Sequence, residues 1–158
     1  MADVISNIIT GIFIAGVTAY ITVHLSVKRF RQERWWEKQV VAYEKLIEAL
    51  HHSKAFSDEY LSASYECREV SETRDKELRA KSAEAHREIE KVADVGGFLL
   101  STEVRQRIQR YRQESDAASE TTDWVTYLEG SLAATSSCLE DIVKIARKEL
   151  KIDGNEKT

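Results

Sequence analysis

Residues 36–50 have the sequence WEKQVVAYEKLIEAL, in which apolar side chains recur at alternating intervals of four and three. The positions in this series are Trp36, Val40, Tyr43, Ile47 and Leu50. Because an α-helix has about 3.6 residues per turn, such a series lines one helix face and is typical of a coiled-coil-like contact. The stretch therefore predicts an amphipathic helix that buries this face, Trp36 included.

We expect the same helix to extend in both directions. The chain of 158 residues has no proline, and no glycine occurs from Val17 to Val95. After Leu50 the apolar series shifts register, as a stutter in a coiled coil would produce. It continues at Phe56, Tyr60, Ala63, Cys67 and Val70. The first helix is thus expected to reach about Arg68.

Three further amphipathic helices follow. The second is expected to begin near Ser71 and to end at the glycine pair 96–97. The third follows Ser101, a capping residue with an acidic first turn, and the fourth is capped by Thr122 or Asp123. Their apolar positions are Leu78, Ser82, Ala85, Ile89 and Val92; then Val104, Ile108 and Tyr111; then Val125, Leu128, Leu132, Thr135, Leu139, Ile142 and Ala146.

The stretch before these helices has the composition of a membrane span. No Asp, Glu, Lys or Arg occurs from Val4 to Val27, and a helix of that length rises roughly 36 Å, enough to cross a bilayer. Asp3 precedes the stretch and Lys28 follows it, whereas a cleaved signal peptide has positive charge in front. By the positive-inside rule the basic end faces the cytoplasm, which predicts a single-pass protein with its N-terminus outside.

Together these elements predict an all-α protein. Amphipathic helices joined by short turns bury their apolar faces by packing as an antiparallel bundle. The predicted architecture is an N-terminal transmembrane helix (residues 4–27) that continues into a cytoplasmic antiparallel four-helix bundle (residues 28–150) and ends in a frayed tail (residues 151–158).

One face of the predicted span consists of small and polar residues. They are Asn7, Gly11, Ala15, Thr18, Ala19 and Thr22. Small residues four positions apart let helix backbones approach closely in lipid, so we expect self-association into a homo-oligomer through this face. Two alternatives stay open: the hydroxyl groups bond only to their own helix, or the polar face lines a pore.

Basic and aromatic residues follow the span directly. Those expected at the membrane interface are Lys28, Arg29, Arg31, Arg34 and Trp35. They match the basic and aromatic flank of a cytoplasmic membrane boundary. The formal net charge of −4 at pH 7 excludes a uniformly basic nucleic-acid binder, so membrane lipid is the predicted partner and nucleic acid is not.

No motif in the sequence predicts a catalytic, cofactor or metal site. Glu48 and His51 have the Glu-x-x-His spacing of di-iron bundles, but only one copy is present. Arg79 and His86 have a spacing tolerated by HEPN ribonucleases, although Ala80 replaces the usual polar residue. We therefore expect no enzyme, no metal and no cofactor.

The two cysteines also lack a chemical motif. Cys67 and Cys138 have no CxxC or metal-ligand spacing. They are expected to be reduced, semi-buried thiols.

Three segments carry a resemblance. Residues 33–38 have the sequence ERWWEK, residues 42–50 AYEKLIEAL and residues 98–104 FLLSTEV. With the N-terminal span, they resemble a group of small, uncharacterised bacterial single-pass membrane proteins with a cytoplasmic helical bundle. The resemblance implies a bacterial inner (plasma) membrane location and carries no known catalytic residue. Some bacterial antiphage effectors share this architecture, which is an analogy of build alone.

The leading hypothesis is a non-enzymatic, membrane-anchored helical bundle. It would self-associate and act as an interaction or assembly subunit with a cytoplasmic protein partner, for example in a bacterial defence system. The alternative is a membrane-damaging effector that oligomerises into a pore, and the third hypothesis is a HEPN-like ribonuclease.

Overall fold

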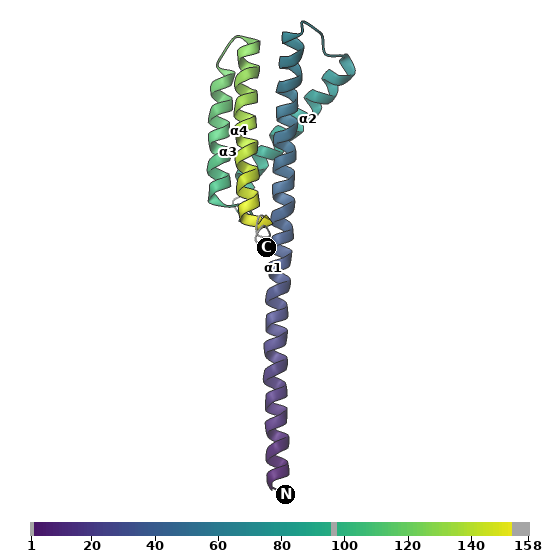
Figure 1. Ribbon diagram of the computed structural model, residues 1–158, viewed down its shortest axis with the longest axis vertical. Coiled ribbons are helices and arrows are strands. Elements are labelled where there is room, and N and C mark those ends of the chain that lie inside the picture. Colours follow the sequence, from purple (N-terminus) through teal and green to yellow (C-terminus); the bar gives the residue numbers. More distant parts are fainter. Residues whose placement is uncertain (1, 96–97, 153–158) are drawn as a thin grey trace, which may run out of the picture. The chain divides into compact units, whose positions relative to one another are not determined.

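The computed structural model describes the backbone of residues 2–95 and 98–152, and the side chains of residues 16–92, 94 and 98–152. Within these residues the chain forms four helices and no strand (Figure 1): α1 (Ala2–Tyr65), α2 (Glu72–Val95), α3 (Thr102–Ser119) and α4 (Trp124–Leu150). The predicted all-α fold is confirmed. Of the predicted tail, residues 153–158 lie outside the described part of the chain.

The chain divides into two units, Met1–Lys38 and Gln39–Thr158. The described residues of the N-terminal unit all belong to α1. The second unit contains the rest of α1 together with α2, α3 and α4.

The predicted helix starts of α3 and α4 are confirmed by their caps. The Ser101 hydroxyl accepts a hydrogen bond of 3.3 Å from the backbone N–H of Val104. The Asp123 carboxylate accepts from both the backbone N–H (2.8 Å) and the hydroxyl (2.6 Å) of Thr126, which selects Asp123 over Thr122 as the cap. These bonds satisfy backbone donors that the first helical turn leaves unpaired.

Helix α1 ends earlier than the apolar series predicts. Cys67 has a φ of 51°, and the N–H of Arg68 donates to the carbonyl of Ala63 at 3.0 Å. A left-handed residue followed by a bond five residues back is the geometry of a Schellman-type helix end. The turn places Cys67 outside the helix, so its predicted semi-buried position is wrong: the residue is exposed.

The core of the second unit follows most of the predicted apolar positions. Tyr43, Leu50, Ile89, Ile108 and Ile142 are all at most 1% exposed. In α1 the buried face also includes Leu46, at 0% exposed, in place of the predicted Ile47, which packs at the edge of the core. The predicted face of α1 therefore does point toward the core, but its centre is rotated slightly toward Leu46.

The prediction that Trp36 is buried is wrong. Its side chain is 49% exposed and belongs to the N-terminal unit, in which α1 is the only helix. An apolar face is buried only where another element covers it, and no second helix is present in that unit to do so.

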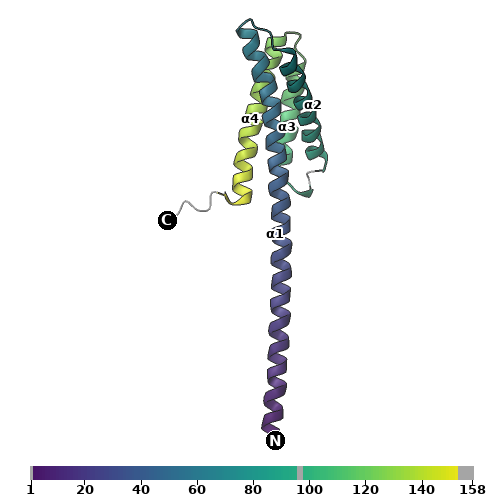
Figure 2. The same cartoon turned by 90° about the vertical axis from the view of Figure 1, so that its right-hand side faces the viewer.

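Helices α3 and α4 run antiparallel and side by side (Figure 1 and Figure 2), joined by the short segment 120–123. Gly130 allows this close approach, because a Cβ atom added there would lie 2.9 Å from the Cβ of Ala118. Polar bonds connect α1 to α4: the Tyr43 hydroxyl donates to Glu149 at 2.5 Å, and the hydroxyl oxygens of Ser57 and Ser131 are 3.0 Å apart.

Gly130→Leu is expected to destabilise the second unit. The larger side chain has no room against Ala118, and overpacking of this kind costs about 1–3 kcal/mol. Urea unfolding followed by circular dichroism measures the loss. Ala133→Leu is the matched control, because Ala133 is exposed on the same helix. Equal unfolding midpoints for the two variants would contradict the close α3–α4 contact.

Candidate functional site

The N-terminal unit exposes large apolar side chains. Those between 42% and 72% exposed from residue 17 to residue 27 are Val17, Tyr20, Ile21, Val23, Leu25 and Val27. At about 100° per residue they occupy an arc of roughly 200° around the helix. An apolar surface this wide marks an interaction with another protein or with lipid. We call it the apolar arc.

The remaining arc carries part of the predicted packing face. Thr18, Ala19 and Thr22 are exposed, and the Thr22 hydroxyl donates to the carbonyl of Thr18 at 2.8 Å. A hydroxyl group bonded to its own helix is one of the two alternatives to self-association, and Thr22 has this bond. The face carries no charged residue. The predicted packing residues Asn7, Gly11 and Ala15 lie outside the part whose side chains are described.

The predicted interface residues are all exposed on α1. They are Lys28, Arg29, Arg31, Arg34 and Trp35. Arg34 pairs with Glu37 at 3.3 Å, and its Cζ lies 5.2 Å from the centre of the Phe30 ring. The segment therefore combines guanidinium groups with exposed aromatic rings.

The predicted transmembrane helix over residues 4–27 has no support from the structure. In the part of the chain that is described, no helix is both long enough and apolar enough to cross a bilayer. About half of the predicted span, residues 4–15, lies where side chains are not described. The span stays a prediction.

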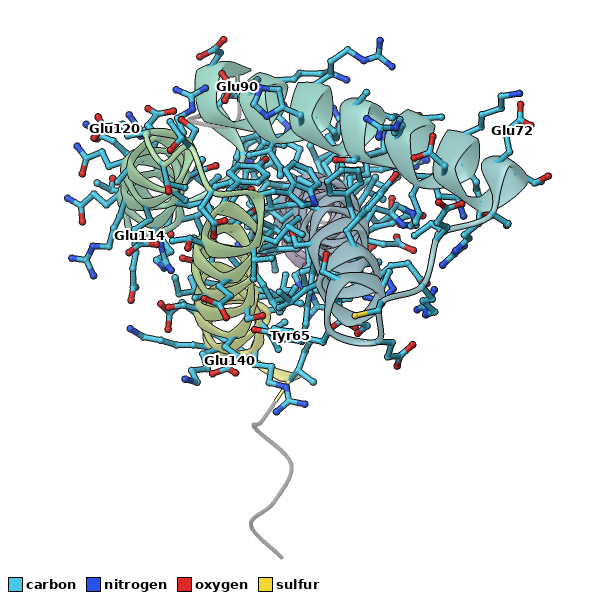
Figure 3. The ribbon with its side chains drawn as sticks, turned by 90° about the horizontal axis from the view of Figure 1, so that it is seen from above. Tyr65, Glu72, Glu90, Glu114, Glu120 and Glu140 are labelled. Atoms are coloured by element: carbon cyan, nitrogen blue, oxygen red, sulfur yellow. The ribbon has the colours of Figure 1, made fainter. Side chains whose placement is uncertain are left out.

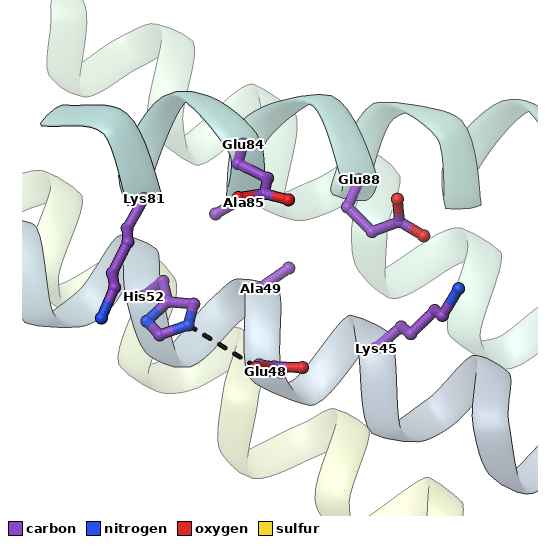
Figure 4. Close-up of a pocket in the computed structure, with 8 residues that line it drawn as sticks. All are labelled: Lys45, Glu48, Ala49, His52, Lys81, Glu84, Ala85 and Glu88. Carbon is purple, nitrogen blue, oxygen red and sulfur yellow. Dashed lines mark ion pairs between the residues drawn. The ribbon is translucent and has the colours of Figure 1, made fainter. Parts of the chain in front are cut away.

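A charged cleft of about 250 Å³ lies between α1 and α2 (Figure 4). Its floor is formed by the buried Ala49 and Ala85, and its walls carry charged side chains from both helices. Glu48 lies near His52, with Nε2 of His52 3.7 Å from Oε1 of Glu48, whereas the Glu-x-x-His spacing noted in the sequence involves His51. Among the described residues no group of His, Cys, Asp and Glu could hold a metal ion.

Arg79 and His86 have different surroundings. The Nε atom of Arg79 donates to both carboxylate oxygens of Asp75, at 2.9 and 3.0 Å. His86 is exposed and lines a separate cleft between α2 and α3, beside Glu90 and Arg112. Arg79 is thus bonded to a carboxylate of its own helix, and His86 lies in a different cleft. The ribonuclease hypothesis stays a prediction.

The sequence analysis missed Arg107, a buried polar residue of the second unit with three side-chain partners. Its side chain is 7% exposed and donates to Asp141 at 2.8 Å, to Ser137 at 3.0 Å and to Glu114 at 3.3 Å. The bonds to Asp141 and Ser137 join α3 to α4, and the bond to Glu114 lies within α3. The position was detectable, because Arg107 follows Val104 by three residues and therefore lies on the buried face of α3.

The neighbouring Cys138 is an inert thiol. It is fully buried on α4, and burial raises the pKa of its thiol to about 11, although the charge of Arg107 opposes the shift. A thiol with this pKa stays protonated near neutral pH, and the thiolate is the reactive form. Cys138 therefore does not suit nucleophilic chemistry.

Arg107→Met is expected to lower the free energy of unfolding by about 1–3 kcal/mol, because it removes the buried guanidinium that bonds to Asp141 and Glu114. Both carboxylates are partly exposed, so water limits the loss. Chemical unfolding measures it. The control Arg105→Met changes an exposed residue of α3 and is expected to stay within about 0.5 kcal/mol of the original protein. A variant at position 107 that is as stable as this control would show that the network does not stabilise the fold.

Comparison with known proteins found no match: no protein-family model, no curated protein and no solved structure is similar to this chain. The resemblance to bacterial single-pass membrane proteins rests on the segments quoted above and stays a prediction. The evidence for function comes from the residues themselves, and it lies in the apolar arc, the basic segment after it and the surface of the bundle.

Proposed function

We propose that the protein is a membrane-anchored helical bundle that self-associates and acts as an interaction or assembly subunit. The observation that carries the proposal is the N-terminal helix, whose sequence has no charged residue from Val4 to Val27 and whose described apolar side chains are exposed over a wide arc. The hydrocarbon core of a bilayer would cover such an arc along the full length of the run.

The basic segment supports an orientation for this anchor. Lys28, Arg29, Arg31 and Arg34 follow the uncharged run immediately and are exposed. Lysine and arginine next to a span are retained on the cytoplasmic side. The second unit would then lie in the cytoplasm, and the resemblance implies the inner membrane of a bacterium.

Self-association is supported by the face opposite the apolar arc. Thr18, Ala19 and Thr22 continue the series of small residues that begins at Gly11 and Ala15 in the sequence. Because the Thr22 hydroxyl is already bonded to its own helix, the contact would depend on close backbone packing more than on interhelical hydrogen bonds.

An interaction role agrees with the state of the polar groups in the second unit. Arg79 is held by Asp75, Arg107 by three partners, and Cys138 is buried with a raised pKa. These three side chains are thus paired or buried within the fold. The exposed surface of the bundle is what remains to meet a partner.

Val17→Arg is expected to shift the protein from the membrane fraction toward the fraction released by alkaline carbonate. Val17 lies near the middle of the proposed span, where an arginine costs about 2.5–3.5 kcal/mol. Val41→Arg is the matched control, since Val41 is also an exposed valine of α1 but follows the basic segment. Equal partitioning of the two variants, or an original protein that carbonate releases completely, would contradict the anchor.

The mass of the full-length protein in nanodiscs tests self-association. A discrete multimer is expected, and Gly11→Leu together with Ala15→Leu is expected to reduce it toward the monomer, because leucine blocks close backbone contact. Val23→Leu adds bulk on the apolar arc and serves as the control. A monomer for the original protein would rule out both self-association and the pore alternative.

A further inference from the structure

Aromatic rings gather at the end of the bundle where α1 finishes and α4 begins. Four of them form a continuous row: Phe56 and Tyr60 have ring centres 4.7 Å apart, Tyr60 meets Trp124 edge-on at 6.0 Å, and Trp124 stacks on Tyr127 at 5.3 Å. Tyr65 lies at the end of α1. We call these five residues the aromatic end.

Two members of the aromatic end are largely accessible. The side chain of Trp124 is 46% exposed and that of Tyr65 is 62% exposed. The Trp124 ring is not needed to start α4, because the Asp123 carboxylate caps that helix. Exposed tryptophan and tyrosine residues are enriched where binding energy concentrates in protein interfaces.

Carboxylates surround the aromatic end. The Tyr60 hydroxyl donates to Asp75 and the Tyr65 hydroxyl to Glu129, while Glu120 is exposed in the segment before Trp124. Figure 3 looks down on this end of the bundle, with Tyr65 and Glu120 labelled.

The negative charge has a basis in the sequence. From residue 113 to residue 143 seven residues are acidic and none is basic. The seven are Glu114, Asp116, Glu120, Asp123, Glu129, Glu140 and Asp141. Three of them, Glu120, Asp123 and Glu129, lie within five residues of Trp124, so the segment that enters α4 is locally negative.

The protein already makes the kind of contact that this surface would offer. The Arg79 guanidinium lies 5.7 Å from the centre of the Tyr60 ring while its Nε bonds to Asp75. A cation over an aromatic ring with a carboxylate beside it combines a cation–π contact with a charge-assisted hydrogen bond. Trp124, whose ring attracts cations more strongly than that of tyrosine, lies next in the row.

We propose that the aromatic end binds a basic segment of a protein partner, with an arginine or lysine side chain over the Trp124 ring and the surrounding carboxylates pairing with its neighbours. The inference rests on the proposed role as an interaction subunit and names the chemistry of the partner. It does not depend on the membrane anchor.

Peptide binding to the full-length protein in zwitterionic nanodiscs tests the proposal. The probe is a fluorescently labelled peptide of six Arg-Gly repeats, compared with six Gln-Gly repeats, and binding is followed by anisotropy. In a Trp35→Phe, Trp36→Phe background, Trp124 is the only tryptophan, so quenching of its emission reports contact at the site. The arginine peptide is expected to bind and to quench, and the glutamine peptide to do neither.

Three variants locate the contact. Trp124→Ala is expected to weaken binding by about fivefold, Trp124→Phe by less because an aromatic face remains, and Glu120→Gln by about threefold. Glu84→Gln is the matched control: it removes the same charge from the wall of the α1–α2 cleft and is expected to leave binding within about twofold. Circular dichroism and urea unfolding confirm that each variant keeps its fold.

Several results would overturn the inference. They are failure of the arginine peptide to bind, unchanged binding by both Trp124 variants, and an effect of Glu84→Gln as large as that of Glu120→Gln, which would show attraction by bulk charge alone. A smaller oligomer for Trp124→Ala in nanodiscs would assign the surface to a second copy of the chain and likewise overturn it. Equal partitioning of Val17→Arg and Val41→Arg, which would contradict the anchor, leaves these readouts unchanged, so the two proposals fail separately.

Discussion

Covering apolar helix faces is the constraint on which the structure depends. In the second unit four helices cover one another, and Tyr43, Leu46, Leu50, Ile108 and Ile142 are almost fully withdrawn from solvent. In the N-terminal unit the apolar side chains between Val17 and Val27 remain exposed. The same rule that explains the bundle therefore requires a cover for the N-terminal helix, and lipid is the cover proposed here.

Polar contacts fix the relative positions of helices whose core is otherwise held by apolar packing. Arg107 joins α3 to α4 through Asp141 and Ser137, and Tyr43 joins α1 to α4 through Glu149. Burial and the bond to Glu149 raise the pKa of Tyr43, so its hydroxyl remains a donor at any ordinary pH. Buried groups of this kind favour one relative position of the helices over others, provided that every member is bonded.

Local signals made much of the fold predictable, and the failures have a physical reason. Ser101 and Asp123 act on the turn that follows them, so their caps could be assigned without knowing the tertiary structure. Burial of Trp36 would require another helix to pack against it. The exposure of Cys67 follows from a turn that forms without glycine or proline, so the sequence does not signal it. The aromatic end was unpredictable for the same reason, since Tyr60 and Trp124 meet only when α1 and α4 have packed.

Self-association and partner binding would reinforce each other. A single cation–π contact at an exposed ring contributes only about 0.5–1 kcal/mol, so one copy of the aromatic end would hold a basic segment weakly. An oligomer formed through the N-terminal helix would present several copies to one partner. Each further contact would then be intramolecular, and its strength would be set by the effective concentration. Such an assembly would bind firmly only when its copies gather. The small-residue face of the N-terminal helix would then affect affinity at a surface that it does not touch.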